Sequence, residues 1–78
     1  MNFVATFYTH LSALRTARAL EGVGVQAELA PVPRALSSSC GTCVRYSAED
    51  PLLERMDADT EAVYCREGDG YVCLLRNE

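Results

Sequence analysis

Two cysteines separated by two residues, Cys40 and Cys43, are the side chains of this sequence best suited to covalent chemistry. Their C-x-x-C spacing lets two sulfurs meet in a disulfide or occupy two corners of a metal tetrahedron. A thioredoxin-type site places such a pair at the start of a helix, which lowers the pKa of the attacking thiol. The residues that follow here, Val44 to Tyr46, are typical of a strand. The sequence therefore predicts thiols on a loop that leads into a strand.

Polar and cationic residues surround this pair. A run of serines and a glycine flank Cys40, which is typical of an accessible thiol and not of a buried one. Every cation of the chain is an arginine, and a guanidinium binds carboxylates, phosphates and other oxyanions through paired hydrogen bonds. We predict that Cys40 and Cys43 are the reactive thiols. The residues predicted to bind an anion or substrate beside them are Arg34, Arg45, Ser38, Ser39 and Gly41.

Other uses of the four cysteines are open at this stage. Cys40 and Cys43 could simply pack a tight turn, and all four thiols could hold zinc if the C-terminal pair reached the first. The spacing disfavours zinc, because seven residues separate Cys65 from Cys73. We expect Cys65 and Cys73 to pack in the interior, and we predict no resident metal or cofactor. The single histidine, His10, is expected at the surface, where it would assist a thiol only if the loop came close.

The elements that must position the loop begin with a strand and a helix. Residues 3–8 are rich in aromatic and β-branched side chains and predict a central strand. Thr9 can cap a helix that starts at the next residue and runs to residue 21, where a Gly-Val-Gly segment ends it. Ser12 and Arg15 fall on its exposed face. The residues that share its buried face are Ala13, Leu14, Ala17 and Leu20.

Two further strands, a second helix and a hairpin complete the predicted fold. The expected segments are a strand over 25–29 ended by Pro31 and Pro33, a strand over 43–46, a short helix from Asp50-Pro51 to residues 57–59, and a hairpin of 62–66 and 71–75. In that hairpin, Cys73 pairs with Cys65 if the turn has three residues, or with Arg66 if the turn is Asp69-Gly70. The predicted fold is one α+β domain, residues 1–78: a two-layer sandwich, ferredoxin-like βαββα followed by a C-terminal β-hairpin.

Composition limits the classes of partner. The chain has 78 residues, of which 49% are hydrophobic and 23% charged, enough for the core of one small domain. A net charge of −4 argues against nucleic acid or an anionic membrane surface as partner, because both require a basic footprint. No apolar run is long enough to span a membrane, and the first residues do not look like a signal peptide. We therefore expect a cytoplasmic protein, whose four cysteines would be free, metal-bound or redox-active.

Several short segments between Phe7 and Tyr46 together resemble a known family. They are Phe7-Tyr8-Thr9, Ala13-Leu14, Gly24-Val25, Pro31-Val32-Pro33-Arg34 and Ser38-Ser39-Cys40-Gly41. In this combination they are similar to the putative selenium/sulfur carrier protein-like family of small domains. The resemblance implies a compact α/β domain in which Cys40 carries sulfur or selenium as a persulfide or selenosulfide, with Arg34 as the arginine after the double proline. The family's first helix often carries an acidic residue where this chain has Ala17.

These observations predict a sulfur or selenium carrier, or thiol relay, that uses Cys40 together with Cys43. Its partners would be donor and acceptor proteins for the transferred atom, and a homodimer is compatible with the small size of the chain. The residues favour a carrier over an enzyme, because no carboxylate pair, nucleophile–base pair or phosphate-binding glycine loop accompanies the thiols. The alternative is a non-catalytic partner-interaction module whose cysteines are structural or bind zinc.

Overall fold

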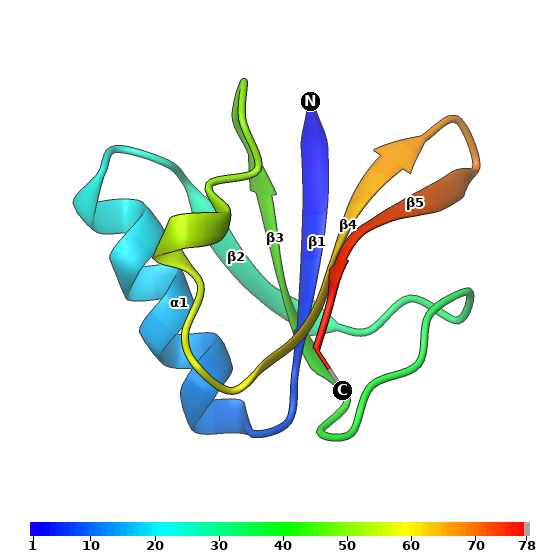
Figure 1. Cartoon of the computed structure of the whole chain (residues 1–78), viewed down its shortest axis with the longest axis horizontal. Coiled ribbons are helices and arrows are strands. Elements are labelled where there is room, and N and C mark those ends of the chain that lie inside the picture. The colour runs from blue at the N-terminus through cyan, green and yellow to red at the C-terminus, as the bar shows by residue number, and fades with distance from the viewer. Residues whose placement is uncertain (78) are drawn as a thin grey trace.

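Within residues 1–77, the part of the chain that the computed structural model describes, one antiparallel sheet of five strands carries a single α-helix on one face (Figure 1). The predicted α+β class is confirmed. The strand order is β2-β3-β1-β4-β5, so β1 is the central strand, as its aromatic and β-branched residues predicted. The elements are β1 (Asn2–Phe7), α1 (His10–Gly22), β2 (Ala27–Pro31), β3 (Thr42–Ser47), β4 (Thr60–Glu67) and β5 (Gly70–Arg76).

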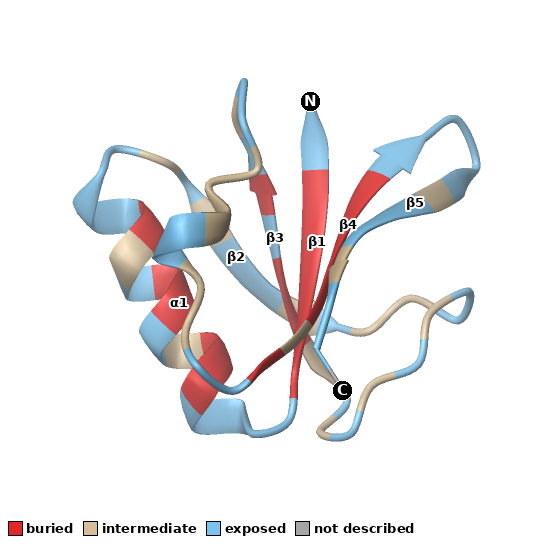
Figure 2. Ribbon diagram, in the orientation of Figure 1, coloured by how far each residue is buried: buried red, intermediate tan, exposed pale blue. Residues whose placement is uncertain are grey.

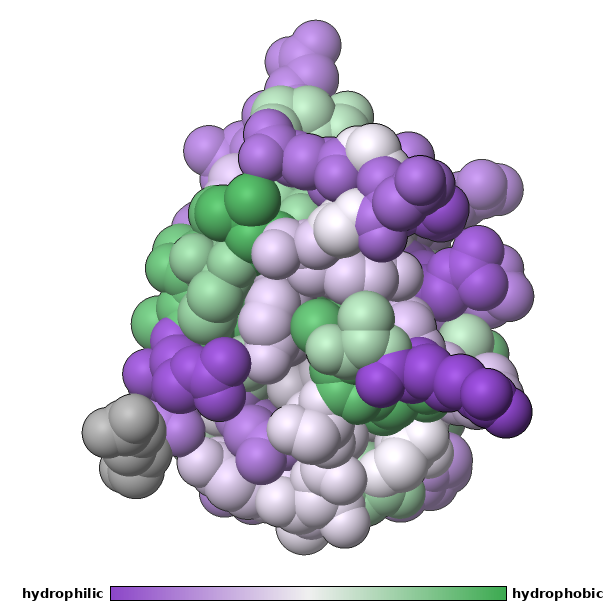
Figure 3. Space-filling view, turned by 90° about the vertical axis from the view of Figure 1, so that its right-hand side faces the viewer, coloured by the Kyte–Doolittle hydropathy of each residue, from purple (hydrophilic) through white to green (hydrophobic). Residues whose placement is uncertain are grey.

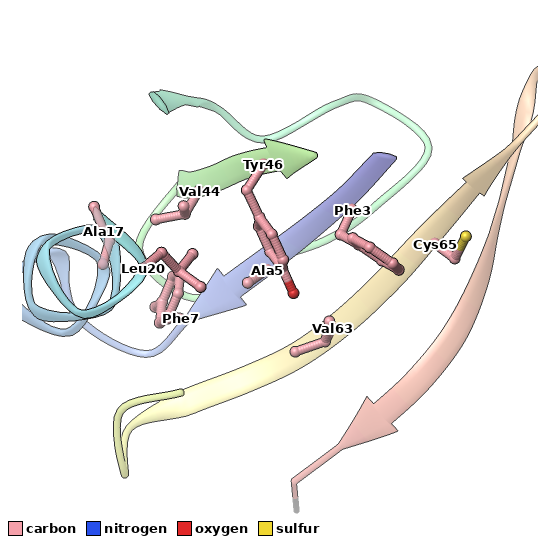
Figure 4. Close-up of a cluster of buried hydrophobic side chains, with 10 residues drawn as sticks. Phe3, Ala5, Phe7, Ala17, Leu20, Val44, Tyr46, Val63 and Cys65 are labelled. Carbon is pink, nitrogen blue, oxygen red and sulfur yellow. The ribbon is translucent and has the colours of Figure 1, made fainter. Parts of the chain in front are cut away.

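The core fills the space between α1 and the sheet. Alternate residues of β1, including Phe3 and Phe7, point into this core, where Leu20 lies beside Phe7 (Figure 4). All three side chains are almost fully buried. Burying a side chain of this size contributes about 1.5–3 kcal/mol each, so this cluster dominates the packing energy. Buried residues concentrate on β1, β3, β4 and one side of α1, while both edge strands are mostly exposed (Figure 2).

The helix begins as predicted, and Ala13, Ala17 and Leu20 are buried as predicted, whereas Leu14 is only half-buried. Thr9 caps it, and the Thr9 hydroxyl accepts a hydrogen bond from the Ser12 amide at 3.1 Å. The prediction that Ser12 faces solvent was wrong, because its hydroxyl donates to the Asp57 carboxylate at 2.8 Å and the side chain is buried. Arg15 is exposed as predicted. No helix within residues 1–77 is long and apolar enough to cross a membrane.

The second strand is displaced by two residues from its predicted position. The amide of Val25 donates to the carbonyl of Leu20 at 3.0 Å, which closes the C-terminus of the helix. Val25 therefore belongs to the helix end, and pairing with β3 starts only at Ala27. Pro31 is the last residue of the strand, as expected of a residue that lacks an amide donor.

The predicted second helix was wrong. In its place lies a 3₁₀ turn over Leu53–Arg55, preceded by Leu52 in the left-handed conformation with φ of 55°. A left-handed residue interrupts a right-handed helix, although Asp50 does accept a hydrogen bond from the Leu52 amide at 2.7 Å. The amide of Asp57 donates to the Thr16 hydroxyl at 3.1 Å instead of continuing a helix. The complete ferredoxin-like βαββα order is therefore not reproduced.

The C-terminal hairpin forms as predicted, but with a register that differs from both alternatives. Glu67 pairs with Gly70, so the two-residue turn is Gly68-Asp69. Gly68 has a φ of 59°, and the first central position of a type II′ turn favours glycine for that reason. From this turn the ladder pairs Cys65 with Val72 and Tyr64 with Cys73, and an irregularity between Tyr64 and Val63 then shifts the register by one residue. The two cysteines therefore lie on opposite faces of the sheet.

Candidate functional site

The connection between β2 and β3 carries the predicted thiols. We call its residues 32–41 the thiol loop. At the base of the loop the Val32 amide donates to the Gly41 carbonyl at 3.1 Å. Gly41 has a φ of 76°, which glycine adopts without steric cost, and this turn directs the chain into β3. Figure 1 shows the loop, in green, at the lower right of the molecule, below the β4 and β5 hairpin.

Two serines fasten the thiol loop to the sheet. The Ser38 hydroxyl donates to the Phe7 carbonyl, at the end of β1, at 3.2 Å. Ser39 donates to the Glu61 carboxylate from both its amide, at 3.1 Å, and its hydroxyl, at 3.2 Å. Both serines were predicted to bind substrate, but in this structure their hydroxyls hold the loop in place. Glu61 was not predicted to take part, because nothing in the sequence links β4 to a loop more than twenty residues earlier.

Cys40 is a free and partly exposed thiol. One side of it packs against the core between the sheet and α1. Its Sγ lies 3.5 Å from the Thr42 carbonyl, to which the thiol can donate. The residue keeps part of its surface exposed to solvent.

Cys43 is a free thiol of a different kind, fully buried on the side of the sheet away from α1. Its Sγ lies 3.6 Å from the Pro31 carbonyl. Burial raises the pKa of the Cys43 thiol, and the nearby guanidinium of Arg45 opposes this effect in part. Cys43 is therefore protonated at neutral pH, so the two cysteines of the C-x-x-C motif are not equivalent.

The two predicted arginines occupy separate places. Arg45 projects from β3 on the side of Cys43, because Val44 and Tyr46 face the core and strand residues alternate. Arg34 is exposed in a turn of the thiol loop that is closed by a hydrogen bond from the Leu36 amide to the Pro33 carbonyl at 3.0 Å. The structure thus brings Arg45 close to Cys43, whereas Arg34 lies on the outside of the loop.

His10 is exposed, as predicted, but lies next to the motif. Its Nδ1 is 3.3 Å from the Thr42 hydroxyl, between the two cysteines in sequence. This contact joins the start of α1 to the start of β3. The sequence offered no signal for it beyond the polar character of both side chains, because a contact between residues so far apart depends on the fold.

The remaining cysteines do not join the motif. Cys65 is buried in the core, as expected, but Cys73 is exposed on the edge strand β5, so the prediction that it packs in the interior was wrong. Among residues 1–77, no three histidine, cysteine, aspartate or glutamate side chains are grouped so that they could hold a metal ion. The four cysteines are not gathered around a common point.

Comparison with known proteins gives one family and one relative. A family model described as "Putative Se/S carrier protein-like" matches residues 2–62. A protein of Escherichia coli (strain K12) described as "Uncharacterized protein YtiA" is 23% identical over 74 residues, which cover 92% of this chain and 87% of that protein. No solved structure matches the chain significantly. The matched residues include α1, the whole thiol loop, the strands β1, β2 and β3, and the first residues of β4.

Proposed function

Because the chain belongs to the putative Se/S carrier protein-like family, we propose that it carries sulfur or selenium on Cys40 as a persulfide or selenosulfide. The observation that supports Cys40 as the carrier is its state as a free, partly exposed thiol in a fastened loop. Cys43 is too buried to receive an atom directly from a second protein. Cys73 is exposed but lies outside the residues that match the family.

The proposed loading step is an attack by the Cys40 thiolate on the outer sulfur of a donor persulfide. A new S–S bond forms on Cys40, the S–S bond of the donor breaks, and the donor cysteine leaves as a thiolate. The sum of thiols and persulfides is unchanged, so this step needs no oxidant. Selenium would be transferred in the same way from a donor selenosulfide. The donor and the acceptor are proposed to be other proteins, which contact the loop in turn.

The proposed unloading step has two routes. In the first, the thiolate of an acceptor protein takes the outer sulfur and Cys40 is regenerated. In the second, Cys43 attacks the Cys40 sulfur, which forms a Cys40–Cys43 disulfide and releases hydrogen sulfide; an external dithiol must then reduce the disulfide. Burial keeps Cys43 protonated, which slows the second route. The first route is therefore favoured until a partner displaces the thiol loop.

Arg34 and Arg45 would have different roles in this function. Arg34 is exposed in the thiol loop and offers a guanidinium to an anionic group on a partner. Arg45 acts on Cys43, because its positive charge favours the thiolate that the second route requires. The free thiols of the chain fit a reducing compartment such as the cytoplasm.

Intact mass spectrometry after exposure to a low-molecular-weight persulfide tests the proposal. A Cys73→Ser background removes the other exposed thiol. We expect an added sulfur atom in this background, which is retained when Cys43→Ser is added and lost when Cys40→Ser is added. A urea unfolding curve shows that each variant is folded. A sulfur adduct that persists without Cys40 would overturn the proposal, and zinc bound in stoichiometric amount would support the structural module instead.

A further inference from the structure

A groove of about 610 Å³ lies along the side of the sheet that α1 does not cover. Its volume is within the range of small-molecule sites. Seen from the side opposite α1, hydrophilic side chains gather over the upper part of the molecule (Figure 3). Strand residues that point away from the core contribute the charged and polar side chains of the groove, and Pro31 and Pro33 form its boundary near the thiol loop. Those polar and charged side chains are Asn2, Glu28, Arg45, Ser47, Arg66 and Tyr71.

Two arginines flank the central strand in this groove. Val4 is paired with Arg45 of β3 on one side and with Tyr64 of β4 on the other. Arg66 lies two residues after Tyr64 on β4, on the same face of the sheet, and is paired with Tyr71 of β5. Adjacent strands are about 4.8 Å apart, so β3 and β4 are separated by only two such steps. The long side chains of Arg45 and Arg66 can therefore reach the same space above β1.

The two guanidiniums are available to a ligand. Both arginines are exposed. By contrast, Arg76 on the same side of the sheet donates to the Tyr64 hydroxyl at 3.2 Å. Guanidinium groups bind carboxylates and phosphates through parallel hydrogen bonds, and two of them together favour a group with more than one negative charge. The hydroxyl and amide side chains of Ser47 and Asn2, which hydrogen-bond each other, add polar surface beside Arg66.

One carboxylate makes the β2 side of the groove unfavourable for an anion. Glu28 of β2 pairs with Arg45 on the side away from β1. Its negative charge repels an anion from the β2 side, so a bound anion is directed toward β1 and Arg66. Glu21, at the end of α1, also lines the groove and has the same effect. On the β5 side, Tyr71 faces Arg66, and its ring packs edge-on against that of Tyr64 at 6.4 Å between centroids.

We infer that this groove binds a small multivalent oxyanion, a phosphate or polycarboxylate, between Arg45 and Arg66. The site is separate from the carrier thiol and does not depend on the proposed function. Acidic macromolecules are poor candidates, because the chain as a whole has a net charge of −4. A small anion is compatible with that charge, since it meets only the local field of the two guanidiniums.

NMR titration of the ¹⁵N-labelled protein with inorganic pyrophosphate, and separately with citrate, tests this inference and distinguishes a phosphate from a carboxylate ligand. We expect shifts of the amides near residues 45 and 66 with either or both anions. Loss of one charge-assisted contact weakens binding by about tenfold or more, so Arg45→Ala and Arg66→Ala should each have this effect. Arg18→Ala, a change of equal charge on the exposed side of α1, should have none.

Glu28→Gln supplies a test in the opposite direction. Removal of this carboxylate should strengthen binding several-fold, because the repulsion beside Arg45 is lost. Absence of binding for both anions, or equal weakening by Arg18→Ala and Arg45→Ala, would overturn the inference. Cys40→Ser should leave anion binding unchanged. A failure of sulfur loading on Cys40 can therefore be distinguished from a failure of anion binding in the groove.

Discussion

Ser39 donates two hydrogen bonds to Glu61, one from its amide at 3.1 Å and one from its hydroxyl at 3.2 Å. The residue next to Cys40 is thereby fixed to β4. Hydrogen bonds to an ionised acceptor are stronger than those between neutral groups. Access to Cys40 should therefore depend on how often this contact opens.

Glu61→Ala should release the thiol loop. We expect alkylation of Cys40 by iodoacetamide to be several-fold faster in a Cys73→Ser background, and the free energy of unfolding to fall by about 1–2 kcal/mol because two hydrogen bonds are lost. Mass spectrometry over time measures the first effect and urea denaturation the second. Glu67→Ala, an exposed carboxylate further along β4, is the matched control. Equal alkylation rates in both variants would show that the contact does not limit access.

The buried thiol of Cys43 should make stability depend on alkaline pH. Burial raises the pKa of this thiol above its ordinary value of 9.0, so the folded state keeps a proton that the unfolded state releases. The contribution is fully present below about pH 9 and is lost, by up to about 1.4 kcal/mol per pH unit, as the pH rises through the folded-state pKa.

Urea denaturation at neutral pH and near pH 10 measures this loss. Cys43→Ala should reduce the decrease in stability, whereas Cys73→Ala, at an exposed position, should leave it unchanged. A remaining decrease is expected in all variants, because burial also raises the pKa of Tyr46. The same pH dependence in Cys43→Ala and in the unchanged protein would contradict the assignment.

The contact between Ser12 and Asp57 should stabilise the protein at neutral pH and lose its effect at acidic pH. The hydrogen bond from the Ser12 hydroxyl lowers the pKa of the Asp57 carboxyl. The resulting stability is present above about pH 4, the ordinary range of an aspartate, and is lost as the pH falls through the lowered pKa. Ser12→Ala should cost about 1–2 kcal/mol at neutral pH and much less near pH 3. Ser37→Ala, at an exposed serine, is the control. A cost of Ser12→Ala that does not change with pH would exclude the carboxylate as the cause.

The parts of the fold that could be predicted are those that depend on neighbours in sequence. The first strand, the cap at Thr9 and the exposure of Arg15 follow from β-propensity, local hydrogen bonding and helical periodicity, and all three are confirmed. Ser12 was misplaced because a serine on a helix gives no local sign of a partner 45 residues later. The left-handed Leu52 was equally hidden, since leucine ordinarily favours a helix.

The candidate site was predicted in composition but not in arrangement. The C-x-x-C motif and its strand were located correctly, because spacing and β-propensity are local properties. The contacts of Ser39 with Glu61 and of His10 with Thr42 depend on which strands are neighbours. The exposure of Cys73 depends on the hairpin register, which the Gly68-Asp69 turn sets by pairing Glu67 with Gly70.

The hydrogen bond between Val32 and Gly41 closes the thiol loop at its base, where the loop meets the sheet. Pairing of β2 with β3 is already complete at the base of the loop, so the eight residues between these two positions are not needed to align the strands. Their length and chemistry can change without altering the sheet, provided that the base is kept. The same sheet could therefore accept a loop of another length and sequence from a relative without a change in its own strand pairing.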